Sequence, residues 1–438
     1  MTAEYDVVIA GAGPAGAQCA RDLAARDYDV VVLETESEDE FPARSNKSTG
    51  GTFPSMMASF GIPDEVVMNF TDSVVLESPS DYYQRRQSGA VLDFGAFKQF
   101  LVDDGIAKGA DYRFDARVAG PVTEGGEIVG VEYNGSETVT GEIVVDATGP
   151  SAPLAKALGT SDLRRERQAI GVEYEMDGID IDADGFADLT DAMMLRLDHD
   201  VAPGGYAWIF HTGAATAKVG VCYIQNDRHR DYARDGFGID DYLHYWIDTD
   251  PRFEDAERLE GVHHRGSAHI QLPHRLSTDR FVAIGDTVPT VDPLWGEGIN
   301  KGMRSARAAA ITADSCLTPD EPDTSAAAMS LYDELWHTEV APRAWSRLLL
   351  TELLYYAPND RYDQLMADLR RADEAVLQNA NDGGKLALTR LLHADDLPLL
   401  GEFAREQLSA YGRPWLRRKV RERAGQVPGV SAVLGLGQ

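Results

Sequence analysis

The spacing of apolar residues changes along this chain, and the changes divide it into segments of different structure. Near the N-terminus, continuous apolar runs at 5–10 and 29–33 flank residues 14–26, where Ala15, Cys19 and Leu23 recur every four positions. A short continuous apolar run is typical of a buried parallel strand, and a spacing of four is typical of a helix. These residues therefore predict a strand–helix–strand unit of a parallel sheet.

The rest of the chain predicts two further kinds of structure. Asn134-Gly135 is a favoured hairpin turn between two predicted strands, and alternating runs between about 160 and 275 indicate an antiparallel sheet. A parallel-type strand is expected again at 281–285, then a helix at 297–313, with helical spacing beyond 325. The other predicted strands are 112–118, 128–133, 143–147, 169–176, 192–198, 205–211, 216–224 and 262–270.

Glycines follow the first predicted strand at the spacing Gly11-x-Gly13-x-x-Gly16. In this position they allow a tight turn, a close approach of the backbone to a pyrophosphate, and close packing of helix on strand. The phosphate then rests on the helix N-terminus. Glu34 ends the second predicted strand, where a carboxylate accepts hydrogen bonds from ribose hydroxyls. The residues predicted to hold a dinucleotide here are Gly11, Gly13, Pro14, Ala15, Gly16 and Glu34.

A second glycine-bearing region points to a flavin. Gly285-Asp286 ends an apolar strand, where ligands bind in open α/β sheets, and its carboxylate suits ribityl hydroxyls; a helix N-cap is the alternative reading of Asp286. Gly296-Glu297-Gly298-Ile299 opens a helix, whose free N–H groups and positive dipole suit the electron-rich edge of a reduced flavin. A nicotinamide cofactor needs no such second terminus. FAD is therefore predicted, held here by Gly285, Asp286, Gly296, Gly298 and Ile299.

Two segments narrow the resemblance to one family. Residues 204–210 contain Tyr206-Ala207-Trp208-Ile209-Phe210, and residues 292–299 read Asp-Pro-Leu-Trp-Gly-Glu-Gly-Ile. They resemble the YxWxFP and NPLxGEGI segments of the geranylgeranyl reductase branch of the aromatic-hydroxylase-like flavoproteins. The chain departs from the family where His211 replaces a proline and where 47–51 lacks a cysteine. By position, the resemblance implies further FAD contacts at Ser48, Thr49, Gly51 and Val118.

Pattern and resemblance together predict an α/β fold of three parts. A chain of 438 residues is too long for one ordinary core. We expect a discontinuous Rossmann-like FAD-binding domain at 1–160 and 276–320. A mostly antiparallel β-sheet substrate domain is expected as an insertion at 161–275, followed by a helical C-terminal region at 321–438.

The sequence shows no Ser-His-Asp set, no HExxH and no metal-ligand spacing. No metal is therefore expected, and the flavin must carry the reaction. Tyr206, Trp208 and Phe210 alternate on one predicted strand and so share a face. This stripe is either an ordinary core face or an apolar wall for a hydrocarbon substrate, which gains about 0.8 kcal/mol per buried CH₂.

The resemblance implies an FAD-dependent reductase that saturates prenyl (geranylgeranyl) double bonds of membrane-lipid precursors by hydride transfer. A menaquinone side-chain reductase, a flavin-dependent aromatic or polyketide monooxygenase, and a non-enzymatic flavin or lipid carrier are the alternatives. The expected partner is a prenyl lipid. The sequence has no second dinucleotide fingerprint, so a ferredoxin or an NAD(P)H-linked reductase remains open as the electron donor.

Charge and cysteine usage indicate the environment. Asp and Glu number 72 against 41 Lys and Arg, giving a net charge of −31 spread along the chain. Dispersed acidic charge is typical of proteins that stay soluble in high salt and predicts a halophilic, haloarchaeal-type protein. Nucleic-acid binding is not expected, because phosphate contacts need a basic stripe. Isolated Cys19, Cys222 and Cys316 fit a cytoplasmic location, and no apolar run reaches the ~18 residues of a membrane span.

One segment departs from this acidic character. Residues 413–423 carry six basic residues and Trp415. Such a segment either docks on the acidic body of the protein or makes a peripheral contact with anionic lipid headgroups.

Overall fold

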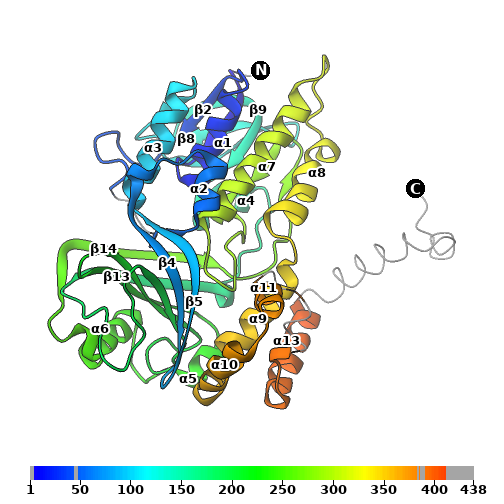
Figure 1. Cartoon of the computed structure of the whole chain (residues 1–438). Helices are drawn as coiled ribbons and strands as arrows, with labels where there is room; N and C mark the ends of the chain where they lie inside the picture. The colour runs from blue at the N-terminus through cyan, green and yellow to red at the C-terminus, as the bar shows by residue number, and fades with distance from the viewer. Residues whose placement is uncertain (1–3, 44–47, 382–383, 385–389, 411–438) are drawn as a thin grey trace, which may run out of the picture.

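The computed structural model describes residues 4–43, 48–381, 384 and 390–410. Two eight-stranded sheets and a group of C-terminal helices make up this part of the chain. In Figure 1 the first sheet lies in the upper half, the second at the lower left, and the last helices at the lower right. Among the described residues, no helix is both long enough and apolar enough to cross a bilayer.

The first sheet is the α/β core. It contains β1 (Tyr5–Ala10), β2 (Val30–Leu33), β6 (Asp111–Arg113), β7 (Val118–Glu124), β8 (Glu127–Tyr133), β9 (Glu137–Asp146), β15 (Ser277–Thr278) and β16 (Phe281–Ala283). The order is β15-β16-β9-β1-β2-β6, with β8 paired to β9 and β7 to β8. Strands β16, β9, β1, β2 and β6 pair in parallel, whereas the β15–β16, β7–β8 and β8–β9 pairs are antiparallel. Val7, Val8 and Ile9 are fully buried because elements cover both faces, which explains the continuous apolar run.

The second sheet is mostly antiparallel. It contains β3 (Gly51–Thr52), β4 (Val67–Glu77), β5 (Tyr82–Leu92), β10 (Gln168–Asp177), β11 (Ala192–Arg196), β12 (Gly205–Gly213), β13 (Thr216–Ile224) and β14 (Glu257–His269). Its order is β14-β10-β13-β12-β11-β4-β5-β3, and only the β11–β4 pair is parallel. This sheet carries the candidate substrate stripe on β12.

Helices cover the first sheet and flank the second. They are α1 (Pro14–Ala24), α2 (Pro54–Phe60), α3 (Phe94–Ala107), α4 (Pro153–Ala157), α5 (Asp227–Tyr232), α6 (Ile239–Thr249), α7 (Ile299–Leu317), α8 (Ala326–Leu335), α9 (Ala344–Tyr355), α10 (Asn359–Arg371), α11 (Glu374–Asn381) and α13 (Leu397–Ala410). Figure 1 shows α1, α3 and α7 side by side over the first sheet.

Helix α6 defines the two faces of the second sheet. Its buried Trp246 and Tyr242 belong to one apolar cluster with Val172 of β10 and Val219 of β13. Side chains alternate along a strand, so the odd-numbered residues of β10 and the even-numbered residues of β12 and β13 point to the other face. The stripe on β12 therefore faces away from α6, toward the rest of the molecule.

The sequence-based elements agree with the structure in most places. The five strands expected between 169 and 270 correspond to β10, β11, β12, β13 and β14, and the hairpin turn at Asn134-Gly135 joins β8 to β9. The single strand expected at 112–118 is wrong. Residues there form β6 and the start of β7, because Asp115 between them has a positive φ of 51° that interrupts an extended chain.

The sheets do not follow the expected domain ranges. The β4–β5 hairpin lies within 1–160, yet it pairs with β11 in the second sheet. The reason is that β11 leaves an open edge, which a parallel strand from the first half of the chain can fill. The division into domains stays a prediction, and the FAD-binding part and the substrate part share this hairpin.

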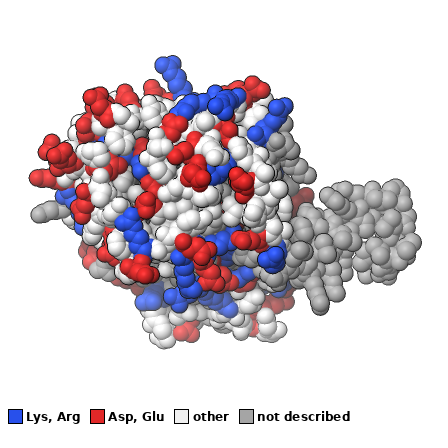
Figure 2. Space-filling view, turned by 90° about the horizontal axis from the view of Figure 1, so that it is seen from below, with Lys and Arg blue, Asp and Glu red and all other residues white. Residues whose placement is uncertain are grey.

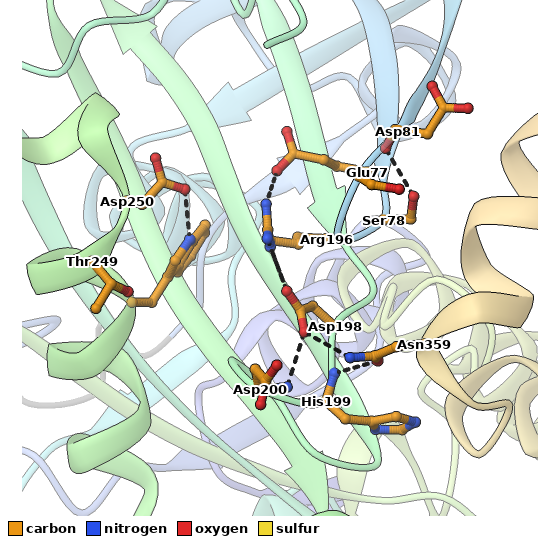
Figure 3. Close-up of polar contacts among 12 residues, drawn as sticks. Glu77, Ser78, Asp81, Arg196, Asp198, His199, Asp200, Thr249, Asp250 and Asn359 are labelled. Atoms are coloured by element: carbon orange, nitrogen blue, oxygen red, sulfur yellow. Dashed lines mark hydrogen bonds and ion pairs between the residues drawn. The ribbon is translucent and has the colours of Figure 1, made fainter. Parts of the chain in front are cut away.

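A buried ionic network joins β4 to its neighbours. The fully buried side chain of Arg252 lies 2.9 Å from Glu77 and 2.7 Å from Asp250. Glu77 also pairs with Arg196, which in turn lies 2.8 Å from Asp198 (Figure 3). Charges this deep stabilise a fold only when each has a partner, and in this network each has one.

Candidate functional site

The turn between β1 and α1 has one open glycine between two closely packed ones. Gly11 has a φ of 101°, and a Cβ there would lie 2.6 Å from the carbonyl oxygen of Ala147. A Cβ on Gly16 would overlap the carbonyl oxygen of Gly11. A Cβ on Gly13, by contrast, would meet nothing within 4 Å. The space before Gly13 is therefore the place where a ligand can approach the backbone.

Helix α1 begins without a side-chain cap. Its N-cap is Gly13 and Pro14 occupies the first turn, so free backbone N–H groups and the positive end of the dipole remain for an anion. Glu34 lies beside this turn. Its Oε2 accepts from the backbone N–H of Ala12 at 2.8 Å, and its Oε1 accepts from that of Glu36 at 3.0 Å. Since a carboxylate accepts about four hydrogen bonds, capacity remains for a ribose.

The late segment meets the first glycine turn. A Cβ on Gly285 would lie 2.8 Å from the Ala15 side chain, and a Cβ on Gly298 would lie 3.9 Å from Asp286 Oδ1. Burial raises the pKa of Asp286 to about 6. Gly298, not Asp286, is the N-cap of α7, and it provides no side-chain cap. Asp286 is therefore available to a ligand rather than used as the cap of that helix.

These groups fit FAD. An open glycine, two uncapped helix N-termini and carboxylates at both ends match a pyrophosphate, a ribose, a ribityl chain and an electron-rich ring edge. Val118, at the start of β7, follows Ala116, whose N–H donates to the Glu34 carbonyl oxygen at 2.7 Å. The structure thus brings Val118 close to the end of β2, where the adenosine is expected.

A cavity of about 940 Å³ lies where the second sheet meets the start of α7. The loop at 48–51, the turn at 295–299 and the stripe on β12 all line it. This volume is near the upper end of the ~300–1,000 Å³ typical of ligand sites. The predicted contacts at Gly11–Gly16, Glu34, Val118 and Asp286 lie outside this cavity. The cavity therefore corresponds to the ring and substrate end of the site.

The aromatic stripe touches both of these segments directly. A Cβ on Gly51 would overlap the ring of Phe210, and a Cβ on Gly296 would overlap the hydroxyl of Tyr206. The rings of Tyr206 and Trp208 lie with centroids 5.8 Å apart. The three side chains therefore form one continuous wall from Gly51 to Gly296. The sequence left open whether the stripe is an ordinary core face or the wall of a substrate site. In the structure the three side chains line the cavity.

The contact of Tyr206 with Gly296 leads to a prediction about stability. Gly296→Ala should lower the free energy of unfolding by about 2–5 kcal/mol, from the φ of 66° and from the overlap with the Tyr206 hydroxyl. Adding Tyr206→Phe removes the overlapping oxygen. The double variant should therefore recover the part of the unfolding free energy that the overlap costs. Urea unfolding measures both.

Gly61→Ala is the matched control for backbone strain. Gly61 has a φ of 62°, and a Cβ there would meet nothing within 4 Å. Only the conformational cost of about 1–2 kcal/mol should appear at this position. If Gly296→Ala and Gly61→Ala cost the same, Tyr206 does not press on the turn.

Sequence reasoning missed two parts of the cavity. The β4–β5 hairpin contributes Val74, Leu76, Tyr83 and Arg85, and the C-terminal helices contribute Leu369, Leu377 and arginines. Burial alternates along β5 in the structure, but the sequence shows no matching alternation, since Val74-Val75-Leu76 is a continuous apolar run and residues 82–87 are all aromatic or polar. No local signal identifies Leu369 or Leu377 either, since a lining residue and a core residue look alike in a helix.

Comparison with known proteins assigns the class. Residues 168–264 match the model of the geranylgeranyl reductase catalytic domain. A solved structure of a geranylgeranyl bacteriochlorophyll reductase-like protein from Thermoplasma acidophilum shares the fold, with a TM-score of 0.74 and 21% identity over 83% of this chain and 91% of that one. A flavin-dependent brominase gives a TM-score of 0.68 at 18% identity, covering 92% of this chain and 100% of its own.

Curated relatives are closer in sequence. The digeranylgeranylglycerophospholipid reductase of Haloferax volcanii is 68% identical over 409 residues, which are 93% of this chain and 100% of that protein. The protein of the same name from Methanosphaerula palustris is 28% identical over 361 residues, covering 79% and 85%. This chain belongs to the geranylgeranyl reductase family, whose members are flavoprotein oxidoreductases that act on the double bonds of prenyl chains.

Family membership confirms several sequence-based predictions. The α/β fold, the reductase class and the prenyl double bond as the group reduced all agree with these matches. The structural neighbours include FAD-dependent halogenases, so the scaffold is one that carries FAD. Figure 2 shows acidic side chains spread over one face among basic ones rather than gathered in one patch. The halophilic character predicted from the net charge of −31 fits the Haloferax relative.

Proposed function

We propose that this protein binds FAD and reduces the geranylgeranyl chains of a digeranylgeranyl glycerophospholipid. The observation that carries the proposal is the cavity, in which an aromatic wall runs from one expected flavin segment at Gly51 to the other at Gly296. The name of the Haloferax relative supplies the lipid. Reduced FAD supplies hydride in such a site.

The residues of the chain then have separate tasks. Tyr206, Trp208 and Phe210 hold an extended hydrocarbon by apolar area, at about 0.8 kcal/mol per buried CH₂, without a charged contact. Their burial also excludes water from the reacting double bond. The uncapped start of α7 at Gly298 presents N–H groups toward negative charge on the ring. Binding and orientation are thus the work of this chain.

Basic side chains near the cavity suit an anionic headgroup. Arg85 of β5, Arg304 of α7 and Arg343 before α9 all line the cavity, in a chain whose net charge is −31. Arg343 has a positive φ of 62°, a conformation that costs energy and is often found at ligand sites. Guanidinium groups bind phosphate in a bidentate manner. We assign these arginines to the lipid phosphate.

The direct test is anaerobic incubation of the dithionite-reduced holoprotein with digeranylgeranylglyceryl phosphate, followed by mass spectrometry. A gain of two hydrogens for each double bond reduced is expected. A gain of oxygen under air would instead favour the monooxygenase. Reduction of a menaquinone side chain, with the glycerolipid left unchanged, would identify the quinone as the substrate.

Arg85 and Arg86 offer a matched pair for the headgroup. They are adjacent on β5 and point to opposite faces, so only Arg85 lines the cavity. Arg85→Gln should raise the KM for the phospholipid about 10-fold or more, because a charge-assisted hydrogen bond contributes ~1.5–3 kcal/mol. Arg86→Gln should leave KM within about twofold. Equal KM values for the two variants would remove Arg85 from the headgroup site.

Our proposals for the electron donor and for a membrane contact rest on the sequence alone. We expect a ferredoxin or an NAD(P)H-linked reductase, because the chain has a single dinucleotide fingerprint. The basic segment at 413–423 lies outside the described residues. Its contact with anionic lipid is an expectation that liposome flotation of a truncated chain tests.

A further inference from the structure

A buried acid and a buried base lie beneath the aromatic wall. Glu173 of β10 and Lys218 of β13 are only 3% and 2% exposed. Both lie on the face of the second sheet that carries Trp208, since Gly220 stands opposite Trp208 on one side and Glu173 on the other. Ionisable residues are seldom placed this deep without a purpose, because their burial costs several kcal/mol.

Glu173 fixes the orientation of the Trp208 indole. A Cβ on Gly220 would overlap the indole, so the ring crosses β13 through the space that this glycine leaves. On the far side, Trp208 Nε1 donates to Glu173 Oε2 at 2.8 Å. Trp208 also lines the cavity. The angle that the indole presents to a substrate is therefore set from behind by this hydrogen bond.

Lys218 connects the same unit to the loop at 48–51. Its Nζ donates to the carbonyl oxygen of Thr49 at 2.9 Å and to that of Leu92 at 3.1 Å. Thr49 lines the cavity and belongs to the loop expected beside the flavin. The backbone N–H of Leu92 returns to the Gly50 carbonyl oxygen at 2.9 Å. The ammonium group is thus held against the backbone of that loop.

Four titratable groups share this region of the sheet. Burial raises the pKa of Glu173, and the nearby Lys218 opposes this effect only in part. Glu175, two residues further on the same face, has its pKa lowered by His264 and Lys218, and His264 Nε2 lies 3.9 Å from Glu175 Oε1. Glu175 thus has His264 as its neighbour, whereas Glu173 is the acceptor of the indole N–H.

We propose that Glu173 and Lys218 are positioning residues that make Trp208 and the loop at 48–51 one rigid unit. The inference rests on the proposed function, because its purpose is to hold a prenyl double bond at a fixed place relative to the cofactor. Displacement of reacting groups by about 1 Å can cost ~100-fold in rate. A rigid connection between the aromatic wall and the loop at 48–51 fixes the distance between the double bond and the cofactor. That distance in turn determines which double bonds are reduced.

The kinetic test is a double-mutant cycle. Trp208→Phe removes the indole N–H, and Glu173→Leu removes its acceptor at similar volume. Each should lower kcat about 10- to 100-fold with KM within about threefold, and leave more partly reduced lipid. The double variant should be no slower than either single variant, because both remove the same hydrogen bond. Multiplied effects would overturn the proposal.

Rescue and control variants separate positioning from packing. Glu173→Gln keeps an oxygen acceptor and should restore kcat to within about threefold of the unmodified protein. Glu175→Gln, on the same strand and face, should change kcat less than twofold. A Glu173→Gln variant as slow as Glu173→Leu would overturn the assignment of Glu173. If Glu173→Leu does not fold, Glu173→Met, which also lacks the carboxylate acceptor, takes its place in the cycle with Trp208→Phe.

A second readout does not depend on activity. Amide hydrogen exchange of the peptide 48–60 in the full chain should rise at least about tenfold in Lys218→Met and Glu173→Leu, and stay unchanged in Glu175→Gln. Unchanged exchange in both variants would show that the loop is not tied to the wall. This result stands even if the unmodified protein fails to reduce prenyl lipids, so the two proposals fail separately.

Discussion

A Gly13→Val variant should fold and yet lose FAD. Gly13 has extended backbone angles that valine adopts, and a Cβ there meets nothing within 4 Å. The valine side chain would occupy the space where the pyrophosphate meets the start of α1. Lost hydrogen bonds and overlap together amount to about 3–5 kcal/mol, or roughly a 100- to 4,000-fold weaker affinity. Flavin fluorescence titration measures the affinity, and the Tm of the FAD-free protein should be unchanged.

Gly16→Ala is the contrasting variant. A Cβ at Gly16 would overlap the carbonyl oxygen of Gly11, which is backbone and cannot move aside. This change should destabilise the FAD-free protein itself, by about 1–3 kcal/mol or more. If Gly13→Val also lowers the Tm of the FAD-free protein, the valine side chain collides with other residues, and the space at Gly13 is not reserved for a ligand. If it binds FAD normally, the pyrophosphate lies elsewhere.

The parallel core and the strands around it could be predicted from the sequence because each produces a local pattern of apolar residues. The run at 5–10 is continuous because β1 is buried on both faces, and β12 and β13 alternate because their two faces meet different neighbours. The β4–β5 hairpin shows no such alternation of apolar and polar residues in its sequence, and its place in the second sheet depends on tertiary pairing. Its partner β11 lies more than a hundred residues later, and no local pattern in one sequence shows that pairing.

The same distinction applies to the site. The glycine turns could be predicted because their spacing follows from the geometry of a phosphate and a helix end. Glu173 and Lys218 could not, because each lies in an ordinary strand and its role depends on Trp208 or Thr49, which are distant in the sequence. A charged residue in a predicted buried strand is the available signal. Such a charged residue indicates that a buried polar contact exists, but it does not identify the residue on the other side of that contact.

The ionic network around Glu77 shows how the parts of the molecule are held in register. Glu77 ends β4, Arg196 ends β11, and Asp198 lies two residues after Arg196. Asp198 Oδ1 also accepts from Asn359 Nδ2 at 3.3 Å, at the start of α10 (Figure 3). One network therefore connects the hairpin, the substrate sheet and the C-terminal helices, all of which contribute to the cavity.

Glu77→Ala should accordingly cost about 3–5 kcal/mol of unfolding free energy. Glu77 pairs with both Arg196 and Arg252, and Arg252 has no exposed side-chain surface, so the substitution leaves buried positive charge with less compensation. Glu65→Ala removes the same charge from an exposed position just before β4 and should cost less than about 0.5 kcal/mol. Urea unfolding at constant high salt compares the two. Equal costs would mean that the network adds nothing beyond surface charge, and that packing alone keeps the hairpin against the substrate sheet.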